Sequence, residues 1–576
     1  MYSDNKMVLQ LMSLLKQFNI RRIVISPGSR HFAFVHSLEA DPWFKLYSVV
    51  DERSAAFFAL GLIQQTDEAV AVTCSSGTAC MNYGSAIVEA YYQRLPLLVL
   101  SSDRIPEYLN QLEDQMYDQL SSFVNCTKYH GQLPDIKSEV DLWYCNRILN
   151  EGLLALNHHG RGPVHINIPF VSHESDTFST PELPMVRKIS IHDAESTKET
   201  WKQVSEQLRG KKVMIAWGQS VHITPELDKA VSRFCEQTDA IILTDKLSNL
   251  HNQNAILNST VVLSLLTKEE RMTLHPDIVI SVGGNYLFNG EIKGLVSKGT
   301  AQSWQVGRED KVIDPFRCLT EVFEMSEEFF FTHFNEYSEV KNKGDYRKTW
   351  LNISKQPAVP QSEYNELYAI GSLLTQLPKN VDLQLANSLT IRMSHMFELD
   401  PSIRVNCNRG VNGIDGSMST AVGFSAENDR PTFYITGDLS FFYDMNSLWI
   451  RHLSPKMRIM LINNGGGGVM YGPLNEEKRK TLQEHVAAGH SVSARGWVES
   501  LGFEYKAAHS KEEVEQGVKL LLDQTIDHPV FLEVFTVINP DDVNAMRTYY
   551  AGQDRRTGTE KLIKDAKSTL KKLLGR

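Results

Sequence analysis

The sequence predicts an α/β protein with three domains, each built on a parallel sheet that helices cover. Apolar strand-like runs alternate with helical segments along the chain, which is the order typical of such sheets. Polar residues recur directly after these runs, at the sheet edge where ligands bind. The chain has 576 residues, which is too long for a single hydrophobic core.

Composition excludes several classes of protein. Apolar residues make up 42% and charged residues 22%, as in soluble globular proteins. The net charge of −10 argues against a nucleic-acid partner. No run approaches the roughly 18 apolar residues of a membrane span, and no signal peptide is visible, so we expect a cytoplasmic protein. The seven cysteines contain no CxxC pair, which favours reduced, buried thiols.

The first domain is predicted over residues 1–185. Its strands are expected at 21–26, 45–50, 69–75, 96–103 and 164–169, with helices at 5–18, at 54–65 and up to about residue 92. The helix at 54–65 has small and apolar faces, which indicates close packing against another helix or another subunit. A further helix over 107–123 would place Gln111, Gln115 and Gln119 on one face.

Two strand ends of this domain carry candidate functional groups. Ser29 and Arg30 place a hydroxyl and a guanidinium after the first strand, although an ordinary loop with a solvent-facing Arg explains them equally well. Glu52 lies at a junction between a strand and a helix, where most acids simply interact with the helix N-terminus. It is nonetheless our candidate for the catalytic acid.

The middle domain is predicted over residues 186–345 and is expected to bind no cofactor. Its strands are expected at 212–217, 240–245, 277–284 and 303–307. Few polar residues cluster at their ends, so a structural spacer and a ligand-binding domain both remain open. The polar stretch 346–362 contains two prolines and is predicted as the linker to the third domain.

The third domain is predicted over residues 363–548, and its central stretch predicts a βαβ unit. A strand-like run ends at Gly437-Asp438, and a second one, 459–462, leads to Asn463-Asn464 and four glycines. Both polar ends should meet at one sheet edge. A carboxylate and an amide oxygen there suit Mg²⁺, and glycines let the backbone approach a diphosphate. Ordinary turns are the alternative interpretation.

Residues 549–576 form a basic, amphipathic end of the chain. A packing or oligomer-contact helix, or a partly frayed tail, is the expected structure.

The βαβ pattern resembles the thiamine diphosphate (ThDP) motif. ThDP needs Mg²⁺ and backbone donors at its diphosphate, and a carboxylate beside N1′ of its aminopyrimidine. Glu52 could supply that carboxylate, because a shared proton makes its burial tolerable. The expected fold is therefore that of the ThDP-dependent decarboxylases.

Eight segments occur in the order seen in the 2-succinyl-5-enolpyruvyl-6-hydroxy-3-cyclohexene-1-carboxylate synthase family of menaquinone biosynthesis. The chain resembles this family over all but residues 549–576. The segments are SPGSR (26–30), DERSAAFFALGL (51–62), SSGTA (75–79), SSDR (101–104), GPVHINIP (162–169), NSLTIR (387–392), NRGVNGIDG (408–416) and GDLSFFYDMNSL (437–448).

The resemblance implies decarboxylation of 2-oxoglutarate and conjugate addition of the resulting succinyl carbanion equivalent to isochorismate, with ThDP and Mg²⁺ or Mn²⁺. It implies that Asp438, Asn464 and the carbonyl of Gly466 bind the metal. The implied cofactor-binding residues are Glu52, Ser76, Gly77, Ser388, Gly413, Ile414, Gly437, Asp438, Leu439, Ser440, Asn464 and Gly466, with Ile414 as the apolar wedge that keeps ThDP bent.

The resemblance also implies a substrate-binding set, which includes residues with catalytic roles beside Glu52. The substrate set is Ser29, Arg30, Arg104, Gln115, Ser388, Arg392 and Arg409, of which Gln115, Arg392 and Arg409 are also catalytic. Both substrates are dicarboxylates, and arginine forks bind carboxylates with two hydrogen bonds. Glu52 and Asp438 belong to different domains, so we expect a homodimer or homotetramer with active sites between subunits.

The chain departs from the family pattern near the acceptor site. Asp114 replaces an Asn, a family lysine of the middle domain matches Glu291 or Lys293, and glycines 465–468 with Val469-Met470 replace a bulkier segment. Two other functions therefore remain open. One is a ThDP-dependent decarboxylase or carboligase with a different acceptor, and the other is a non-catalytic binding module with this fold.

Overall fold

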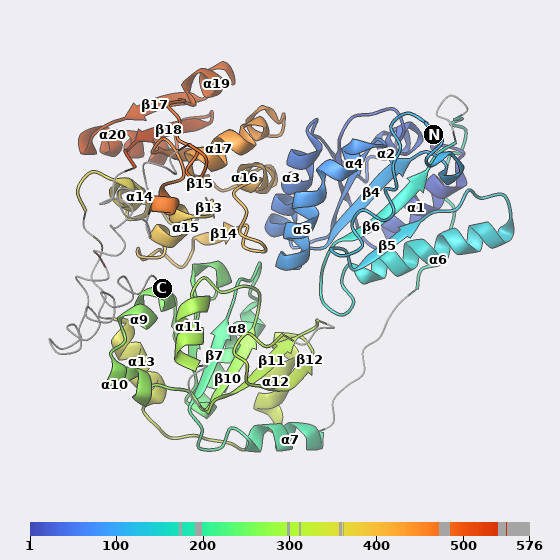
Figure 1. Cartoon of the computed structure of the whole chain (residues 1–576). Coiled ribbons are helices and arrows are strands. Elements are labelled where there is room, and N and C mark those ends of the chain that lie inside the picture. Colours follow the sequence, from blue (N-terminus) through green and yellow to red (C-terminus); the bar gives the residue numbers. More distant parts are fainter. Residues whose placement is uncertain are drawn as a thin grey trace.

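The structure is a computed structural model that describes residues 1–171, 176–189, 198–296, 300–309, 313–355, 360, 362–471, 484–538 and 549. It confirms three α/β domains, each with a parallel, six-stranded sheet (Figure 1). The first and third domains face each other across a pair of helices, and the middle domain lies against both (Figure 1). The basic segment predicted for 549–576 lies outside the described residues, apart from Tyr549.

The first domain contains every strand that the sequence predicted. Its sheet order is β2-β1-β3-β4-β6-β5. The strands are β1 (Arg22–Ile25), β2 (Lys45–Ser48), β3 (Val70–Cys74), β4 (Leu97–Asp103), β5 (Tyr129–Gln132) and β6 (Val164–Pro169). The helices are α1 (Lys6–Gln17), α2 (Phe32–Glu39), α3 (Glu52–Thr66), α4 (Thr78–Asn82), α5 (Gly84–Gln93), the 3-10 turn η1 (Pro106–Tyr108) and α6 (Glu139–Ala155).

The helix predicted over 107–123 is wrong. Only η1 forms there, and Leu112 and Gln115 adopt left-handed backbone angles, with φ of 60° and 51°, that break a right-handed helix. Gln119 turns inward, where its Nε2 donates to the carbonyl of Ser102 (3.2 Å) and its Oε1 accepts the N–H of Gly77 (2.7 Å). These buried hydrogen bonds, which the sequence pattern does not encode, decide the path of the segment.

The middle domain has the sheet order β12-β11-β10-β7-β8-β9, which is the order 3-2-1-4-5-6 of dinucleotide-binding folds read from the opposite edge. The strands are β7 (Val213–Trp217), β8 (Ile241–Leu243), β9 (Ala255–Ile256), β10 (Ile278–Val282), β11 (Gln302–Gly307) and β12 (Leu319–Glu324). The helices are α7 (Lys198–Glu206), α8 (Pro225–Thr238), η2 (Lys246–Ser248), α9 (Ser259–Leu265), α10 (Lys268–Thr273), α11 (Asn289–Val296), α12 (Glu327–Tyr337) and α13 (Tyr346–Ser354).

Helix α13 occupies much of the stretch predicted as a linker, so the linker prediction is wrong over these residues. Tyr346, Trp350 and Ile353 are buried in the core of the middle domain. Their spacing of i, i+4 and i+7 is the pattern of an amphipathic helix and was a usable signal in the sequence.

The third domain repeats the strand order of the first, β14-β13-β15-β16-β18-β17. The strands are β13 (Asp382–Leu385), β14 (Arg404–Cys407), β15 (Thr432–Gly437), β16 (Met457–Asn463), β17 (Glu504–Ala508) and β18 (Val530–Phe535). The helices are α14 (Glu366–Leu374), α15 (Leu389–Ser394), α16 (Ser417–Ser425), α17 (Asp438–Asp444), η3 (Met445–Trp449), η4 (Gly468–Tyr471), α19 (Arg495–Ser500) and α20 (Lys511–Leu522). The predicted βαβ unit is present as β15, α17 and the parallel β16.

Helices α3 and α16 join the first and third domains at two glycines. A Cβ on Gly61 would lie 2.0 Å from the carbonyl oxygen of Thr420, and one on Gly423 would lie 2.0 Å from that of Phe58. The backbones therefore approach as closely as glycine alone permits. This contact confirms the close helix packing that the small faces of 54–65 predicted.

Gly61→Ala is expected to lower the melting temperature, because its methyl group forces the two backbones apart at a local cost of about 3 kcal/mol. Differential scanning calorimetry measures the shift. Gly294→Ala is the matched control, since this glycine of α11 has open space around its Cβ position. There the change should be neutral or stabilise by up to about 1 kcal/mol. Equal melting temperatures for the two variants would contradict the close approach.

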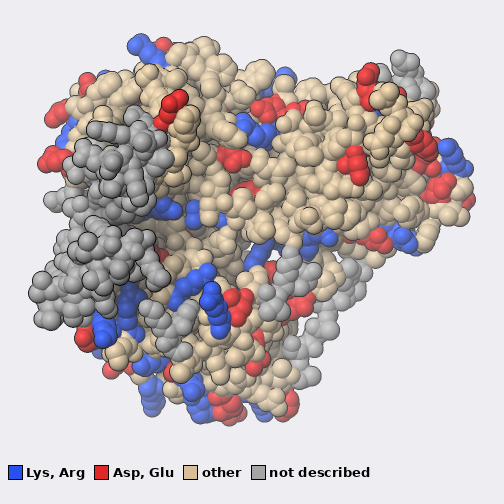
Figure 2. Space-filling view, viewed as in Figure 1, with Lys and Arg blue, Asp and Glu red and all other residues tan. Residues whose placement is uncertain are grey.

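The distribution of charged side chains and the state of the cysteines agree with what the composition indicated. On the face shown in Figure 2, positive and negative side chains are interspersed. All seven cysteines are free, and five of them are buried, which confirms the prediction of reduced thiols. Among the described residues, no helix is both long and apolar enough to cross a membrane.

Candidate active site

Asp438 is the first residue of α17 and directly follows β15, at the edge where parallel strands end. Its side chain is buried, and its Oδ1 accepts the N–H of Leu439 at 2.6 Å. Its Oδ2 accepts the N–H groups of Gly465 (2.7 Å) and Gly466 (3.0 Å). Burial raises the pKa of the Asp438 carboxyl, and these donors oppose the rise. The carboxylate is therefore held in place by the loop after β16.

Asn464 meets Asp438 at the same loop. Its Oδ1 accepts the N–H of Gly466 at 3.1 Å, and its Nδ2 donates to Oε1 of Glu366 at 2.5 Å. Gly466 has a φ of 150°, and a Cβ there would lie 2.7 Å from the carbonyl oxygen of Ala487. This position therefore requires glycine. The two polar ends of the βαβ unit meet, as the sequence predicted.

The donor set at this loop fits a hard divalent cation. One carboxylate, one amide oxygen and the carbonyl of Gly466 leave coordination positions that phosphate oxygens can fill, which is how Mg²⁺ is held beside a diphosphate. In the described part of the chain, no group of three or more His, Cys, Asp and Glu side chains could hold a metal by itself. The residues therefore suit Mg²⁺ that is bound together with a phosphorylated cofactor.

His490 also faces the carboxylate and was missed from the sequence. Its Nε2 lies 3.3 Å from Oδ2 of Asp438 and is buried without a hydrogen bond. A buried polar atom beside the proposed metal ligand is a second sign that a polar group binds next to this loop. No local sequence pattern links His490 to Asp438.

The segment of residues 413–414 lies beside the first turn of α17, which Asp438 begins. The carbonyl of Gly413 accepts from Nδ2 of Asn387 (2.7 Å), and that of Ile414 accepts from Oγ of Ser440 (2.6 Å). The apolar side chain of Ile414 is 38% exposed. An exposed apolar residue at this position fits the predicted wedge beneath a bent cofactor. Gly437 and Leu439 flank Asp438 in the chain.

Glu52 opens α3 in the first domain. Asp51 caps this helix by accepting the N–H of Ser54 at 3.2 Å, and Glu52 is half-buried. Burial raises the pKa of the Glu52 carboxyl. A carboxyl group that tends to keep its proton suits proton exchange with a ring nitrogen. Among the described residues of one chain, no hydrogen bond or ion pair joins Glu52 to the loop around Asp438.

Ser76 and Gly77 follow β3 in the same domain. The hydroxyl of Ser76 is buried without a hydrogen-bond partner, and Gly77 has a φ of 79°. A Cβ at Gly77 would lie 3.1 Å from the carbonyl of Gln115, whose own side chain is exposed. The hydroxyl of Ser76 in this turn is therefore available to hydrogen-bond a ligand.

The four predicted arginines form two pairs, one in each outer domain. Burial lowers the pKa of Arg30, and the neighbouring charge of Arg104 lowers it further. Burial and the neighbouring charge of Arg409 likewise lower the pKa of Arg392. Two neighbouring positive charges suit the binding of a dianion. Among the described residues, no interaction joins one pair to the other.

Acidic residues accompany two of these arginines, Arg104 and Arg392. Glu113 pairs with Arg104 at 2.7 Å, and the carbonyl of Asp114 accepts from its Nε at 2.7 Å. Burial and the charge of Arg409 lower the pKa of Arg392, and the charge of Glu291 in α11 opposes this change. Ser29, exposed after β1, lies next to Arg30 in the chain.

Ser388 has a strained backbone at the start of α15, with φ of 75° and ψ of −129°. Asn387 supports this turn, because its Nδ2 donates to the carbonyl of Asn408 (2.6 Å) and its Oδ1 accepts from Nη1 of Arg409 (2.8 Å). Strain of this kind costs about 1–3 kcal/mol and is retained mainly at functional sites. Asn387 was missed from the sequence.

Ser388→Gly is expected to raise stability by about 1 kcal/mol through relief of this strain. It is also expected to reduce kcat/KM about tenfold, because Ser388 is a predicted substrate-binding residue and the variant loses its hydroxyl. Thermal unfolding and steady-state kinetics measure the two effects. Ser388→Ala is the control, since it loses the hydroxyl and keeps the strain, so its activity should fall without a gain in stability. A destabilised Ser388→Gly would refute the strain.

Glu533 is another residue that the sequence analysis missed. It is fully buried in β18, and its carboxylate accepts from Nδ2 of Asn463 (2.7 Å) and from the hydroxyl of Tyr505 (2.7 Å). It thereby fixes the residue before Asn464. An acid inside the apolar run 529–535 was the available signal, because buried acids need partners.

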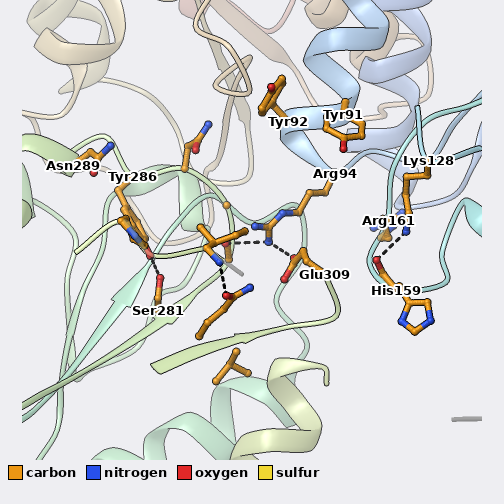
Figure 3. Close-up of a pocket in the computed structure, with 17 residues that line it drawn as sticks. Tyr91, Tyr92, Arg94, Lys128, His159, Arg161, Ser281, Tyr286, Asn289 and Glu309 are labelled. Carbon is orange, nitrogen blue, oxygen red and sulfur yellow. Dashed lines mark hydrogen bonds and ion pairs between the residues drawn. The ribbon is translucent and has the colours of Figure 1, made fainter. Parts of the chain in front are cut away.

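A cavity of about 380 Å³ lies between the first and middle domains, and Figure 3 shows the residues that line it. Arg94 reaches into it from the end of α5, pairs with Glu309 and donates to the carbonyl of Gly283 (3.2 Å). None of the predicted site residues lines this cavity.

Comparison with known proteins agrees with the fold. The N-terminal TPP binding domain of thiamine pyrophosphate enzymes matches residues 6–122, and the C-terminal TPP binding domain matches residues 389–534. The crystal structure of a benzoylformate decarboxylase from Polynucleobacter necessarius has the same fold, with a TM-score of 0.68 and 14% identity, covering 94% of this chain and 99% of that one.

Sequence relatives extend over nearly the whole chain. A 2-succinyl-5-enolpyruvyl-6-hydroxy-3-cyclohexene-1-carboxylate synthase from Bacteroides fragilis is 38% identical over 556 residues, which cover 96% of this chain and 99% of the relative. The synthase of the same name from Flavobacterium johnsoniae is 32% identical, over 91% of this chain and 95% of the relative.

The fold and the site thus define a thiamine pyrophosphate enzyme, and thiamine pyrophosphate is another name for ThDP. Within that class, the chain belongs to the 2-succinyl-5-enolpyruvyl-6-hydroxy-3-cyclohexene-1-carboxylate synthase family.

Proposed function

We propose that this enzyme uses ThDP and Mg²⁺ to decarboxylate 2-oxoglutarate and to add the succinyl unit to isochorismate in menaquinone biosynthesis. The products are 2-succinyl-5-enolpyruvyl-6-hydroxy-3-cyclohexene-1-carboxylate and CO₂. The observation that carries the proposal is the convergence of Asp438, Asn464 and Gly466 on one glycine loop. That loop lies next to α15, because a Cβ at Gly468 would be 3.6 Å from Leu389.

In this proposal the loop residues hold the cofactor. Asp438, Asn464 and the carbonyl of Gly466 bind Mg²⁺, which links the diphosphate to the third domain. Ile414 supports the middle of the cofactor, and Glu52 holds a proton at N1′ of the aminopyrimidine. When bound, ThDP supplies the electron sink that a decarboxylation needs.

The arginine pairs bind the substrates. Each substrate carries two carboxylates, and a guanidinium fork binds a carboxylate bidentately. Arg392 and Arg409 approach from the third domain, while Arg30 and Arg104 approach from the first. Fixing both reactants before they meet lowers the entropic part of the barrier.

The two groups that must grip opposite ends of one cofactor lie on different domains, so we propose a site shared by two copies of the chain. A homodimer, or a homotetramer made of such dimers, places Glu52 of one copy against the Asp438 loop of the other.

A different acceptor is the second candidate function, and one observation favours it. Glu113 already neutralises Arg104, and Asp114 stands where the family has an amide. A dicarboxylate acceptor must displace that ion pair.

Mass spectrometry of the product from purified protein, ThDP, Mg²⁺, 2-oxoglutarate and isochorismate tests the main proposal. CO₂ release should rise when isochorismate is added. Release that isochorismate does not stimulate would exclude the named reaction and favour another acceptor.

A further inference from the structure

The edge strand β14 and the turn after it are held from outside their own domain. In the middle domain, Asn249 accepts the N–H of Val405 (2.9 Å) and donates to its carbonyl (3.1 Å), as a neighbouring strand would. Gln219 donates to the carbonyl of Cys407 at 2.8 Å. Val405 and Cys407 lie two residues apart, so these backbone groups point to the same side of the strand. Because β14 is at the edge of the sheet, side-chain amides bond the backbone groups that a further strand would otherwise pair.

The same pattern continues to Arg409. Nδ2 of Asn285, also from the middle domain, donates to the carbonyls of Arg409 (2.6 Å) and Gly410 (3.1 Å). Asn285 itself is exposed. The peptide that follows Arg409 is therefore fixed by a side chain of another domain.

Glu89 of α5, in the first domain, holds the next two residues. It is only 2% exposed, and its two carboxylate oxygens accept the N–H groups of Gly410 (2.9 Å) and Val411 (2.9 Å). Nε2 of Gln93 donates to it at 2.5 Å. A Cβ at Gly410 would lie 2.6 Å from the carbonyl oxygen of Glu89, so only glycine lets the turn come this close.

We propose that Glu89 and Asn285 are positioning residues for Arg409. They fix the backbone on its C-terminal side, while Asn387 holds its guanidinium, and this sets where the guanidinium meets a substrate carboxylate. The inference rests on the proposed function, in which Arg409 binds a substrate. It gives the middle domain a role in the reaction without a ligand of its own.

The reason that such support matters is geometric. A bidentate contact between a guanidinium and a carboxylate tolerates little displacement, and a misplacement of about 1 Å can reduce the rate about 10²-fold. Buried carboxylates are costly, and burial raises the pKa of Glu89 while its hydrogen bonds oppose the rise. The buried carboxylate of Glu89 is compensated by the N–H groups of Gly410 and Val411, so its burial serves to hold this turn.

The experiment compares Glu89→Gln, Asn285→Asp and Arg409→Lys in the full-length holoenzyme. Both positioning variants keep the size of the side chain; Glu89→Gln replaces one acceptor oxygen and Asn285→Asp removes the donor. We expect each to raise, about tenfold, the KM of whichever substrate Arg409→Lys affects, with ThDP affinity unchanged. Hydrogen exchange across residues 404–416 should accelerate. Glu39→Gln, at an exposed site, is the matched control.

Double variants separate positioning from general destabilisation. If Glu89 acts through Arg409, Glu89→Gln should add little to the KM defect of Arg409→Lys. Faster exchange with both KM values unchanged would overturn the positioning role, and so would unchanged exchange. If Glu89→Gln does not fold, Asn285→Asp decides the outcome. A wild-type protein that forms no product would instead overturn the proposed function, while the exchange data still report on the turn.

Discussion

Replacing Glu52 with Gln is expected to reduce turnover by about 10²–10⁴-fold while ThDP still binds. The amide keeps the size of the side chain but cannot exchange a proton with N1′ of the aminopyrimidine. Steady-state product formation and ThDP titration by tryptophan fluorescence measure the two quantities. Burial raises the pKa of the Glu52 carboxyl, which favours the form that holds a proton.

The control for this prediction is a glutamate far from the site. Glu39→Gln changes an exposed residue at the end of α2 and should leave both quantities unchanged. Normal turnover in Glu52→Gln would remove Glu52 from the mechanism, and lost ThDP binding would assign it a purely structural role.

The second large effect is expected for Asp438→Asn, which should weaken Mg²⁺-dependent ThDP binding by about 10²-fold or more. The neutral amide can still accept the N–H groups of Gly465 and Gly466, so the loop should stay in place while the only carboxylate among the proposed ligands is lost. A ligand at 100 times its Kd stabilises the folded state by about 2.7 kcal/mol, and this gain should disappear.

Thermal melts with ThDP, in Mg²⁺ or in EDTA, measure that gain. Wild type should be stabilised in Mg²⁺ only, and Asp438→Asn in neither condition. Asp429→Asn, at an exposed position, is the control and should behave like wild type. Mg²⁺-dependent stabilisation of Asp438→Asn would contradict the proposed metal site.

Mixing these two inactive variants tests the shared site. In a mixed dimer, intact Glu52 from one copy and intact Asp438 from the other complete one site. Denaturing and refolding equal amounts together should therefore restore about one quarter of wild-type turnover. If both residues served one site within a single chain, mixing would restore nothing.

Local patterns predicted those parts of the site that lie at strand ends. Asp438, Asn464 and Gly466 follow β15 and β16, and parallel strands bring such ends to one edge, so their meeting was predictable. The prediction was wrong at Tyr346 and Trp350, which belong to helix α13, because their helical spacing lies in a stretch that was interpreted as a polar linker. The helix expected at Gln115 failed because its backbone follows contacts with β3 and β4.

By itself the sequence determined the three parallel sheets and the glycine loop beside Asp438, because these follow from periodicity and turn chemistry over short stretches. Most of the other cofactor-binding residues were implied by the resemblance to a family. Only the tertiary structure decided that Glu89, Asn285 and His490 belong to this region. Each lies far in sequence from the group it faces. Glu89 and Asn285 reach across domain boundaries and His490 reaches across its own domain, and no local pattern records such contacts.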